Sequence, residues 1–251
     1  MSKLFKSRVL VLRRRPLGEA DEVVSLLAPD RGRFDAAVRG SRRPSSPLGG
    51  KVEPFTELQA LFAAGRSLDH LTQASIHRAR PGLHRDLERL LHGSYLLDLV
   101  GGVLPFHEPC PELYGVLTRA LDLLEEGAAP SPLCRWVELR LADLLGYAPE
   151  LDRCSECGSP DPGWFSAASG GAVCVPCREG GDPEAGAGVS LSPPARAALR
   201  HLRGCRLESA VRVRLAPGPA REVERALFEH LQHHWPRALR SRDVLRSVGT
   251  P

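Results

Sequence analysis

Four cysteines in the middle of the chain have the residue type and spacing of a metal site. Cys154 and Cys157 form one C-x-x-C pair, Cys174 and Cys177 form a second, and sixteen residues separate the two pairs. This spacing is typical of a four-cysteine zinc site, in which two short turns direct four thiolates at one tetrahedral ion. Gly158 follows the first pair and suits a turn that needs a positive φ. We therefore predict one structural Zn²⁺ per chain, held by these four cysteines.

Other uses of the four cysteines fit less well. Dithiol redox centres usually follow a strand in a βαβ unit, whereas here the surroundings are rich in Gly, Pro and Ser. Disulfides are disfavoured because seven cysteines occur without a secretory segment, which indicates a reducing compartment. A catalytic zinc needs an open coordination position, which four thiolates do not leave. The remaining three cysteines are interpreted as small apolar fillers: Cys110, Cys134 and Cys205.

Catalytic motifs are not found elsewhere in the chain. Gly49-Gly50-Lys51 resembles the end of a phosphate loop, but Ser45 stands where the first Gly is required and Val52 where Ser or Thr should follow. No G-x-S-x-G and no deaminase-type H-x-E motif occurs. Three histidines near the end of the chain lack the intervening Glu of H-E-x-x-H and are interpreted as a solvated or interfacial cluster: His230, His233 and His234. We predict that the protein is not an enzyme.

Positive charge is concentrated at the N-terminal end. Residues 1–80 contain 15 Lys and Arg against 8 Asp and Glu, a balance of +7, while the rest of the chain has a balance of −3. Such asymmetry indicates a polyanionic partner. Arg39, Arg42, Arg43 and Lys51 crowd one Gly-, Ser- and Pro-containing stretch that holds no acid. A solvated surface is the alternative, but unpaired like charge favours contact with nucleic acid. The predicted DNA-binding residues are Arg13, Arg14, Arg15, Arg31, Arg33, Arg39, Arg42, Arg43 and Lys51.

Five short strands are expected in the first eighty residues. Runs rich in Val, Leu and Phe are separated by turn sequences such as Pro16-Leu17-Gly18 and Pro29-Asp30-Arg31-Gly32. The runs are 8–12, 22–27, 33–38, 52–62 and 68–76. Strands at this spacing predict a small closed barrel, of which the five-stranded OB barrel binds oligonucleotides.

Helical periodicity replaces the strand pattern after Pro81-Gly82. Amphipathic or buried helices are predicted over 87–100, 113–124, 133–145, 191–203 and 223–235, with Ser131 as an N-cap before Pro132. Residues 179–188 are Gly- and Ala-rich and are interpreted as a mobile linker. Residues 206–215 alternate in a way that permits a strand.

These patterns give an α+β multidomain fold with four parts. We predict an OB barrel over 1–80, a helical bundle over 81–149, the zinc module over 150–180, and a C-terminal helical part over 181–251. The longest apolar run, 96–104, is too short and too rich in glycine to cross a bilayer, and the first residues lack a signal-peptide core. We expect a soluble, cytoplasmic and nucleoid-associated protein.

Several segments together resemble one family. Residues 12–32 with Gly18-Glu19-Ala20-Asp21-Glu22, then Val38-Arg39-Gly40-Ser41-Arg42-Arg43, then Glu53-Pro54-Phe55-Thr56-Glu57-Leu58, are similar to the RecO family of bacterial recombination mediators. The tail, Leu239-Arg240-Ser241-Arg242-Asp243-Val244-Leu245, also resembles that family, with Arg240 where Lys is usual; Arg39 likewise replaces a common Lys. The resemblance extends over nearly the whole chain and over the order of its parts.

The resemblance implies a function. Members bind single- and double-stranded DNA, anneal complementary strands, associate with RecR, and help to load RecA onto strands covered by single-stranded DNA-binding protein. An alternative of another class is a zinc-ribbon adaptor in transcription or RNA handling, with the cysteine module as the contact surface. Residues 158–173 contain Trp164 and Phe165 but no Lys or Arg, so the loop between the cysteine pairs offers little to phosphates.

Overall fold

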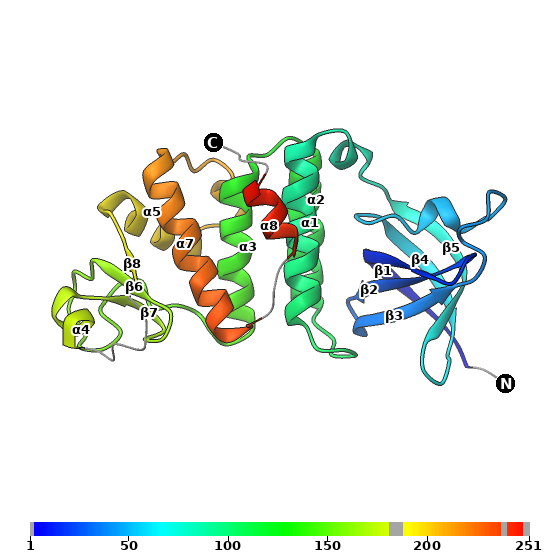
Figure 1. Ribbon diagram of the computed structural model, residues 1–251, viewed down its shortest axis with the longest axis horizontal. Coiled ribbons are helices and arrows are strands. Elements are labelled where there is room, and N and C mark those ends of the chain that lie inside the picture. Colours follow the sequence, from blue (N-terminus) through cyan, green and yellow to red (C-terminus); the bar gives the residue numbers. More distant parts are fainter. Residues whose placement is uncertain (1–2, 181–187, 237–239, 248–251) are drawn as a thin grey trace. The chain divides into compact units, whose positions relative to one another are not determined.

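The computed structural model describes residues 3–180, 188–236 and 240–247, and the chain divides into two compact units (Figure 1). Unit 1 contains Met1–Gly127 together with Leu239–Thr250, and unit 2 contains Ala128–Ala238. Among the described residues, no helix is long and apolar enough to cross a membrane. The four-part division by sequence pattern stays a prediction.

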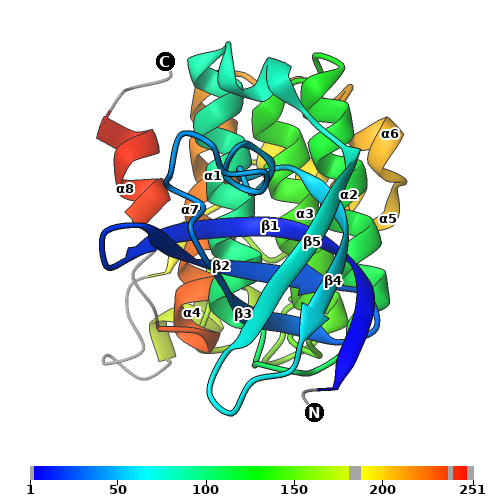
Figure 2. The ribbon, with the colours of Figure 1, turned by 90° about the vertical axis from the view of Figure 1, so that its right-hand side faces the viewer.

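Unit 1 begins with a closed five-stranded barrel, seen face-on in Figure 2, so the predicted OB-like architecture is confirmed. The strands are β1 (Leu4–Leu17), β2 (Asp21–Ala28), β3 (Gly32–Val38), β4 (Glu57–Ala63) and β5 (Asp69–Arg78). Their order around the barrel is β1-β2-β3-β5-β4. Only the β3–β5 pair is parallel, at Ala36↔Asp69 and Ala37↔His70. This parallel contact closes the sheet, so that its edges are largely paired.

The barrel interior is built by alternate residues of every strand. Val9 and Val11 of β1 and Val24 and Leu26 of β2 are fully buried there. Phe34 and Phe62 are fully buried in this core, and the partly buried Phe5 packs against it, with Phe5–Phe62 ring centroids 5.1 Å apart and Phe34–Phe62 centroids 5.3 Å apart. The rings of Phe34 and Phe62 are therefore part of the core and are not presented to a ligand.

The fourth strand starts later than the sequence pattern suggested. The prediction of a strand over 52–62 is wrong for its first part: β4 begins at Glu57, and the short 3-10 helix η1 (Gly49–Lys51) and a turn precede it. Phe55 lies in that turn with φ +70°. A non-glycine residue in this region costs about 1–3 kcal/mol and needs strong surrounding contacts. Here the ring is buried, with its centroid 5.2 Å from that of His84, and it packs so close to Gly93 that a Cβ added there would lie 3.0 Å from the Phe55 Cε1.

Helices complete unit 1. The short 3-10 helix η2 (Pro81–His84) leads into α1 (Leu87–Val103), and α2 (Pro111–Glu125) follows. Asp86 caps α1 by accepting a hydrogen bond from the Arg89 N–H at 3.0 Å. The C-terminal α8 (Arg240–Ser247) packs on α1, where the Ser241 hydroxyl donates to Asp98 Oδ2 at 2.9 Å. The chain thus leaves unit 1 after residue 127 and returns to it with its last helix.

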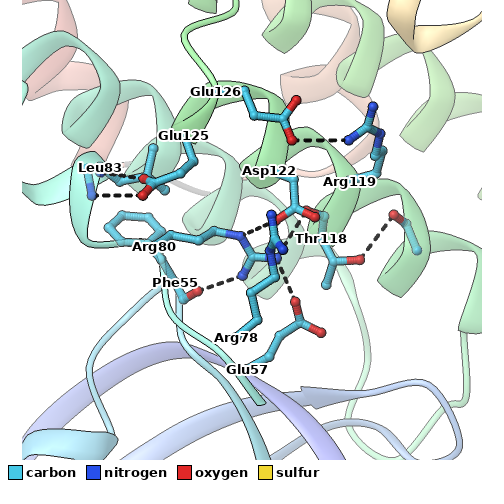
Figure 3. Close-up of polar contacts among 12 residues, drawn as sticks. Phe55, Glu57, Arg78, Arg80, Leu83, Thr118, Arg119, Asp122, Glu125 and Glu126 are labelled. Carbon is cyan, nitrogen blue, oxygen red and sulfur yellow. Dashed lines mark hydrogen bonds and ion pairs between the residues drawn. The ribbon is translucent and has the colours of Figure 1, made fainter. Parts of the chain in front are cut away.

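One buried arginine joins the barrel to α2 (Figure 3). The Arg80 side chain is fully buried, and its guanidinium lies 2.6 Å from Glu57 Oε1 of β4 and 2.7 Å from Asp122 Oδ1 of α2. It also donates to the Phe55 carbonyl at 2.7 Å and to the Thr118 carbonyl at 3.3 Å. All three guanidinium nitrogens therefore have an acceptor, which is the condition for burying a charge.

Tyr114 completes this network. Its hydroxyl donates to Glu57 Oε2 at 2.9 Å, so both oxygens of the carboxylate are engaged. Burial, together with the negative charge of Glu57 and the hydrogen bond to it, raises the pKa of Tyr114 well above its ordinary value. The phenol therefore remains a hydrogen-bond donor at any ordinary pH.

Unit 2 combines helices with a small sheet. Its helices are α3 (Pro130–Leu144), α4 (Val175–Gly180), α5 (Pro193–Gly204), α6 (Leu207–Ala210) and α7 (Pro217–His234), and its three strands are β6 (Trp164–Ser166), β7 (Gly171–Val173) and β8 (Val189–Ser190). The core of this unit gathers Leu139, Phe165, Leu199 and Leu227 from α3, β6, α5 and α7. The pattern-based analysis did not foresee the small sheet.

Two local predictions for unit 2 are wrong. Residues 206–215 contain the short helix α6 and no strand, because Leu207 and Ala210 are the buried positions and lie one helical turn apart. Ser131 does not cap α3: the helix starts at Pro130 with Ala129 before it, since proline suits the first helical turn. The predicted mobile linker falls largely on residues 181–187, which lie outside the described residues.

The Arg80 network should control the stability of unit 1. Replacing Arg80 with Met removes the positive charge that pairs with the buried Glu57 carboxylate. Breaking a buried ion pair in this way lowers the free energy of unfolding by about 3–5 kcal/mol. We expect faster amide hydrogen exchange in β4 and α2 of the full chain, with little change in unit 2. Arg66→Ala, at an exposed position between β4 and β5, is the matched control and should change exchange little.

A second substitution separates the effect of charge pairing from that of packing. In Arg80→Met with Glu57→Gln, the unpaired carboxylate is gone, while Asp122 keeps Arg78 at 2.6 Å. This double variant should recover part of the protection that Arg80→Met removes. Equal exchange in the single and double variants would contradict the argument from charge.

Candidate functional site

The four predicted metal ligands meet at one point of unit 2. The Sγ atoms of Cys154, Cys157, Cys174 and Cys177 all lie within 4.8 Å of one another, and those of Cys157 and Cys174 are 3.6 Å apart. Sulfurs placed tetrahedrally at about 2.3 Å from a zinc ion would be separated by about 3.8 Å. The donor set therefore fits a tetrahedral, thiolate-binding metal ion, and these four cysteines form a metal-binding group.

Backbone turns bring the two cysteine pairs together. Gly158 has φ +75°, and its N–H donates to the Cys154 carbonyl at 2.8 Å, which closes the first turn. The second pair begins directly after β7, and the Cys174 N–H points at Cys154 Sγ, 3.4 Å away. Burial raises the pKa of the Cys154 thiol, but N–H groups of Cys157 and Cys174 outweigh this and lower it to about 6. The first turn thus stabilises the thiolate form of Cys154, which is the form that binds metal, whereas hydrogen bonds with Cys157 and Cys174 raise the pKa of Cys177 above its ordinary value.

The same turns bury two of the four cysteines, while Cys157 is exposed and Cys177 is partly buried. Cys154 and Cys174 are buried, and with Val173 they form a small apolar cluster. Arg178 of α4 lies over the Trp164 ring, with its Cζ 3.6 Å from the centroid. This contact packs α4 against β6 beside the second cysteine pair.

The nine predicted DNA-binding residues lie in two places on unit 1. Arg13, Arg14 and Arg15 follow the barrel portion of β1, and its partner β2 also pairs with β3 through Glu22↔Val38, just before residue 39. This pairing brings the end of β1, just after Arg15, level with the start of the loop 39–51, while Arg13 lies further back, opposite Ser25 and so level with Asp35 of β3. We call residues 39–51 the basic loop. Arg31 and Arg33 lie at the other end of β3, about 20 Å away along a strand of this length.

Arg31 and Arg33 have contacts within the fold. The Arg31 guanidinium lies 3.9 Å from the Phe5 ring centroid and 4.0 Å from Asp69. Arg33 donates to the Gly101 carbonyl and lies 4.3 Å from the Phe106 ring centroid. Cations held in this way are less available to a phosphate than exposed ones, because leaving these partners costs free energy.

At the other end, the cations differ in their engagement. Arg14 and Arg15 pair with Glu53 at 2.6 Å and Asp35 at 3.2 Å, yet remain exposed. Arg42 and Lys51 are tied to backbone carbonyls, of Gly18 at 3.1 Å and Ala74 at 3.0 Å. Three exposed cations have no ion pair or side-chain hydrogen bond within the described part of the chain: Arg13, Arg39 and Arg43.

Two features of unit 1 escaped the sequence reasoning. Lys6 and Arg8 are exposed on the outer side of β1 and add to the positive charge of the barrel; their alternation with Phe5, Ser7 and Val9 was a signal for this. The Arg80 network had no sequence signal, because its acids come from β4 and α2, 23 and 42 positions away.

The histidines do not form a second metal group among the described residues. The interpretation as a solvated or interfacial cluster is wrong for His230, which is 1% exposed, and fits His233, which is exposed. His230 Nε2 lies 2.6 Å from the Tyr147 carbonyl, so this nitrogen carries the proton, and Nδ1 is buried without a partner. Burial lowers the pKa of His230 below its ordinary value.

Comparison with known proteins gives the family. The family model described as Recombination protein O N terminal matches residues 1–80, and the one described as Recombination protein O C terminal matches residues 84–243. The chain belongs to the RecO family. DNA repair protein RecO of Anaeromyxobacter sp. (strain K) is 36% identical over 245 residues, covering 96% of this chain and 95% of the relative.

Other RecO relatives match comparably. DNA repair protein RecO of Desulforudis audaxviator is 34% identical over 255 residues, with 98% of each chain covered, and that of Pelotomaculum thermopropionicum is 40% identical over 177 residues, with 70% and 69% covered. The family confirms the resemblance and makes this chain a DNA repair protein. The matched parts include both the barrel and the cysteine module.

Buried His230 predicts an acid-sensitive unit 2. An unfolded histidine binds a proton below about pH 6.5, whereas the desolvated native ring does so only at lower pH. The unfolded state thus binds more protons in this window, and the free energy of unfolding of unit 2 falls as pH drops through it. Hydrogen exchange of α7 measured from pH 7 downward should show this decrease after correction for intrinsic exchange rates.

Two substitutions test whether His230 causes this pH dependence. Gln at position 230 can donate to the Tyr147 carbonyl without titrating, so His230→Gln should make the stability of α7 less dependent on pH. His201→Gln, on the exposed face of α5, is the matched control and should keep the parent profile. The same pH dependence in His230→Gln and in the parent protein would refute the assignment.

Proposed function

We propose that this chain is a non-enzymatic recombination mediator that binds single- and double-stranded DNA through the barrel of unit 1 and anneals complementary strands. The observation that carries this proposal is the gathering of exposed cations at one end of the barrel, with Arg13, Arg39 and Arg43 available for phosphates. Arg14, Arg15, Arg42 and Lys51 surround them and add charge, while Arg31 and Arg33 are secondary candidates.

Membership of the family supports the proposed partners. We propose that the chain acts with RecR to load RecA onto strands covered by single-stranded DNA-binding protein, at the nucleoid in the cytoplasm. The binding mode favours this role, because a protein that holds phosphates leaves the base edges free to pair.

We further propose that the metal ion is Zn²⁺ with a structural role. Four thiolates select a soft, tetrahedral ion, and they close its coordination shell, so the ion would supply folding free energy to the cysteine module and not activate a water molecule. Cys154, Cys157, Cys174 and Cys177 would hold it between the first turn and the start of α4.

Metal analysis tests the zinc assignment. Freshly purified protein should contain about one zinc per chain, and Cys154→Ser or Cys174→Ser should lose it and loosen β6 and β7, because structural sites typically supply about 10 kcal/mol or more. Cys110→Ser, at a partly buried cysteine outside the group, is the control and should keep its zinc. Protein without zinc, or a zinc-free Cys154→Ser with unchanged hydrogen exchange in the module, would contradict the structural role.

The salt dependence of DNA binding tests the basic surface. Removing one arginine that binds a phosphate should lower the slope of log K against log salt by roughly 0.7 to 0.9 and should weaken binding to all sequences alike. We expect this for Arg39→Ala and Arg43→Ala in titrations of labelled oligonucleotides. Arg221→Ala, at an exposed position on α7 of unit 2, is the control. An unchanged slope in the Arg39 and Arg43 double variant would exclude the basic loop as the phosphate site.

Annealing tests the binding mode. Because Phe5, Phe34 and Phe62 pack against one another and Phe55 is buried, the barrel has few rings for base stacking, which is what gives selectivity for single strands. We expect affinities for single and double strands within roughly tenfold, a difference of about 1.4 kcal/mol, and annealing without ATP. A preference for single strands above roughly a hundredfold, about 2.8 kcal/mol, or a requirement for ATP, would disprove this mode.

A further inference from the structure

The turn between β1 and β2 presents two adjacent apolar residues to solvent. Pro16 is exposed and Leu17 is 45% exposed, and Gly18 at φ +68° then turns the chain. A single exposed leucine needs no explanation. Here, however, the apolar pair ends β1 directly after three arginines and just before the turn Gly18-Glu19-Ala20, which carries the exposed Glu19. We call Pro16 and Leu17 the apolar tip.

The hairpin extends beyond the part of the barrel that β4 covers. β1 pairs with β4 only from Leu4 to Leu10, but with β2 as far as Leu17. Residues 13–17 therefore pair with β2 on one side and have no strand on the other. Figure 2 shows this hairpin, in dark blue, at the left-hand edge of the barrel. A ribbon of this kind can approach a ligand with its tip and one edge.

Cations lie on the same face as the apolar tip. Residues at alternate positions of a strand share a face, so Arg13, Arg15 and Leu17 point to one side of the hairpin. Arg15 shares its charge with Asp35 at 3.2 Å, and Arg13 has no charged partner among the described residues. Leu17 thus lies on the strand face that carries Arg13 and Arg15, with Asp21 paired opposite it.

The basic loop is tied to the same turn by three hydrogen bonds. The Arg42 N–H donates to the Ala20 carbonyl at 3.0 Å, the Gly40 N–H donates to Asp21 Oδ1 at 2.8 Å, and the Arg42 guanidinium donates to the Gly18 carbonyl at 3.1 Å. Arg39 and Arg43 are therefore held beside the tip on a braced support. The apolar tip and the start of the basic loop are therefore held together, with Asp21 paired opposite Leu17.

We infer that Leu17, backed by Pro16, is an apolar wedge that enters between neighbouring base pairs of duplex DNA while Arg13, Arg39 and Arg43 hold the flanking phosphates. This inference rests on the proposed function. Leucine and proline are among the side chains that unstack base steps in this way, and the cost of unstacking is offset by contacts with the deformed backbone. Nucleic acid offers closely spaced phosphates with an apolar stack between them, which matches this charge pattern.

A wedge gives this barrel a means to disturb a duplex without aromatic stacking. The described rings of the barrel are engaged in its core or at the junction with the helices. Because Leu17 would contact no base edge, it would act at base steps of any sequence. Opening of a step beside a junction would help a second strand to pair there.

The test uses a short duplex with 2-aminopurine in place of one internal adenine, whose fluorescence rises when the base is unstacked. Binding of the full chain should raise the signal. Leu17→Ala should abolish this increase and keep the salt slope of the parent protein, because the cations that bind phosphate are all still present. Leu17→Met, which keeps the apolar length, should retain the increase.

A matched control lies on the same strand. Leu4 is also exposed, at 59%, but at the opposite end of β1 and far from the basic loop. Leu4→Ala should behave as the parent protein. Thermal unfolding of all variants checks that the fold is unchanged.

The outcomes separate the wedge from the proposed function. Binding with a normal salt slope but without a fluorescence increase would overturn the wedge and leave the proposed function in place. An increase that persists in Leu17→Ala would overturn it too, since the unstacking would arise elsewhere. If Leu17→Ala instead keeps the increase and weakens binding to strands coated by single-stranded DNA-binding protein, Leu17 is a protein contact. Absence of DNA binding by the parent protein would refute the proposed function itself.

Discussion

A single buried guanidinium determines how unit 1 is built. Arg80 has no access to water, so its charge must be balanced inside the protein, and the two balancing carboxylates come from β4 and α2. A shift of this helix against the barrel would therefore leave a buried charge without its partner. The same guanidinium fixes the Phe55 carbonyl, in a residue whose positive φ needs external support. One interaction thus sets the junction, the entry into β4 and the path of the chain after β5.

Strand register and hydrogen bonds also hold the basic surface in place. The register of β1, β2 and β3 brings the hairpin tip and the basic loop together, although they are more than twenty positions apart in the sequence. The hydrogen bonds from Arg42 and Gly40 then hold the loop on the hairpin. Cations placed on such a support lose little conformational freedom on binding, which is where preorganised sites gain affinity.

The sequence predicted those parts of the molecule that depend on local or regularly spaced residues. The cysteine pairs, the five strands and the long helices were predicted because ligand spacing and hydrophobic periodicity can be recognised within short stretches of sequence. The helix α6 was missed because Val211, Val213 and Leu215 alternate, while the burial of Leu207 and Ala210 depends on the core of unit 2. The Arg80 network and the burial of His230 could not be predicted from the sequence, because both depend on partners that are distant in the chain.

The charges illustrate the same limit at the candidate site. In sequence, Arg31 and Arg39 are equivalent members of a basic N-terminal region. In the structure, the first lies over the Phe5 ring and near Asp69, while the second is exposed beside the hairpin tip. Counting cations therefore overestimates the number available for a polyanion, because some of them stabilise the fold. In the proposed binding mode, phosphate is held by the cations that the fold leaves exposed and without ion pairs or side-chain hydrogen bonds among the described residues. Among the predicted residues these are Arg13, Arg39 and Arg43, on β1 and on the loop that is hydrogen-bonded to the β1–β2 turn. The chemistry of the surface is accordingly that of charge neutralisation around an aliphatic contact, which differs from the base stacking on exposed rings by which many OB domains select single strands.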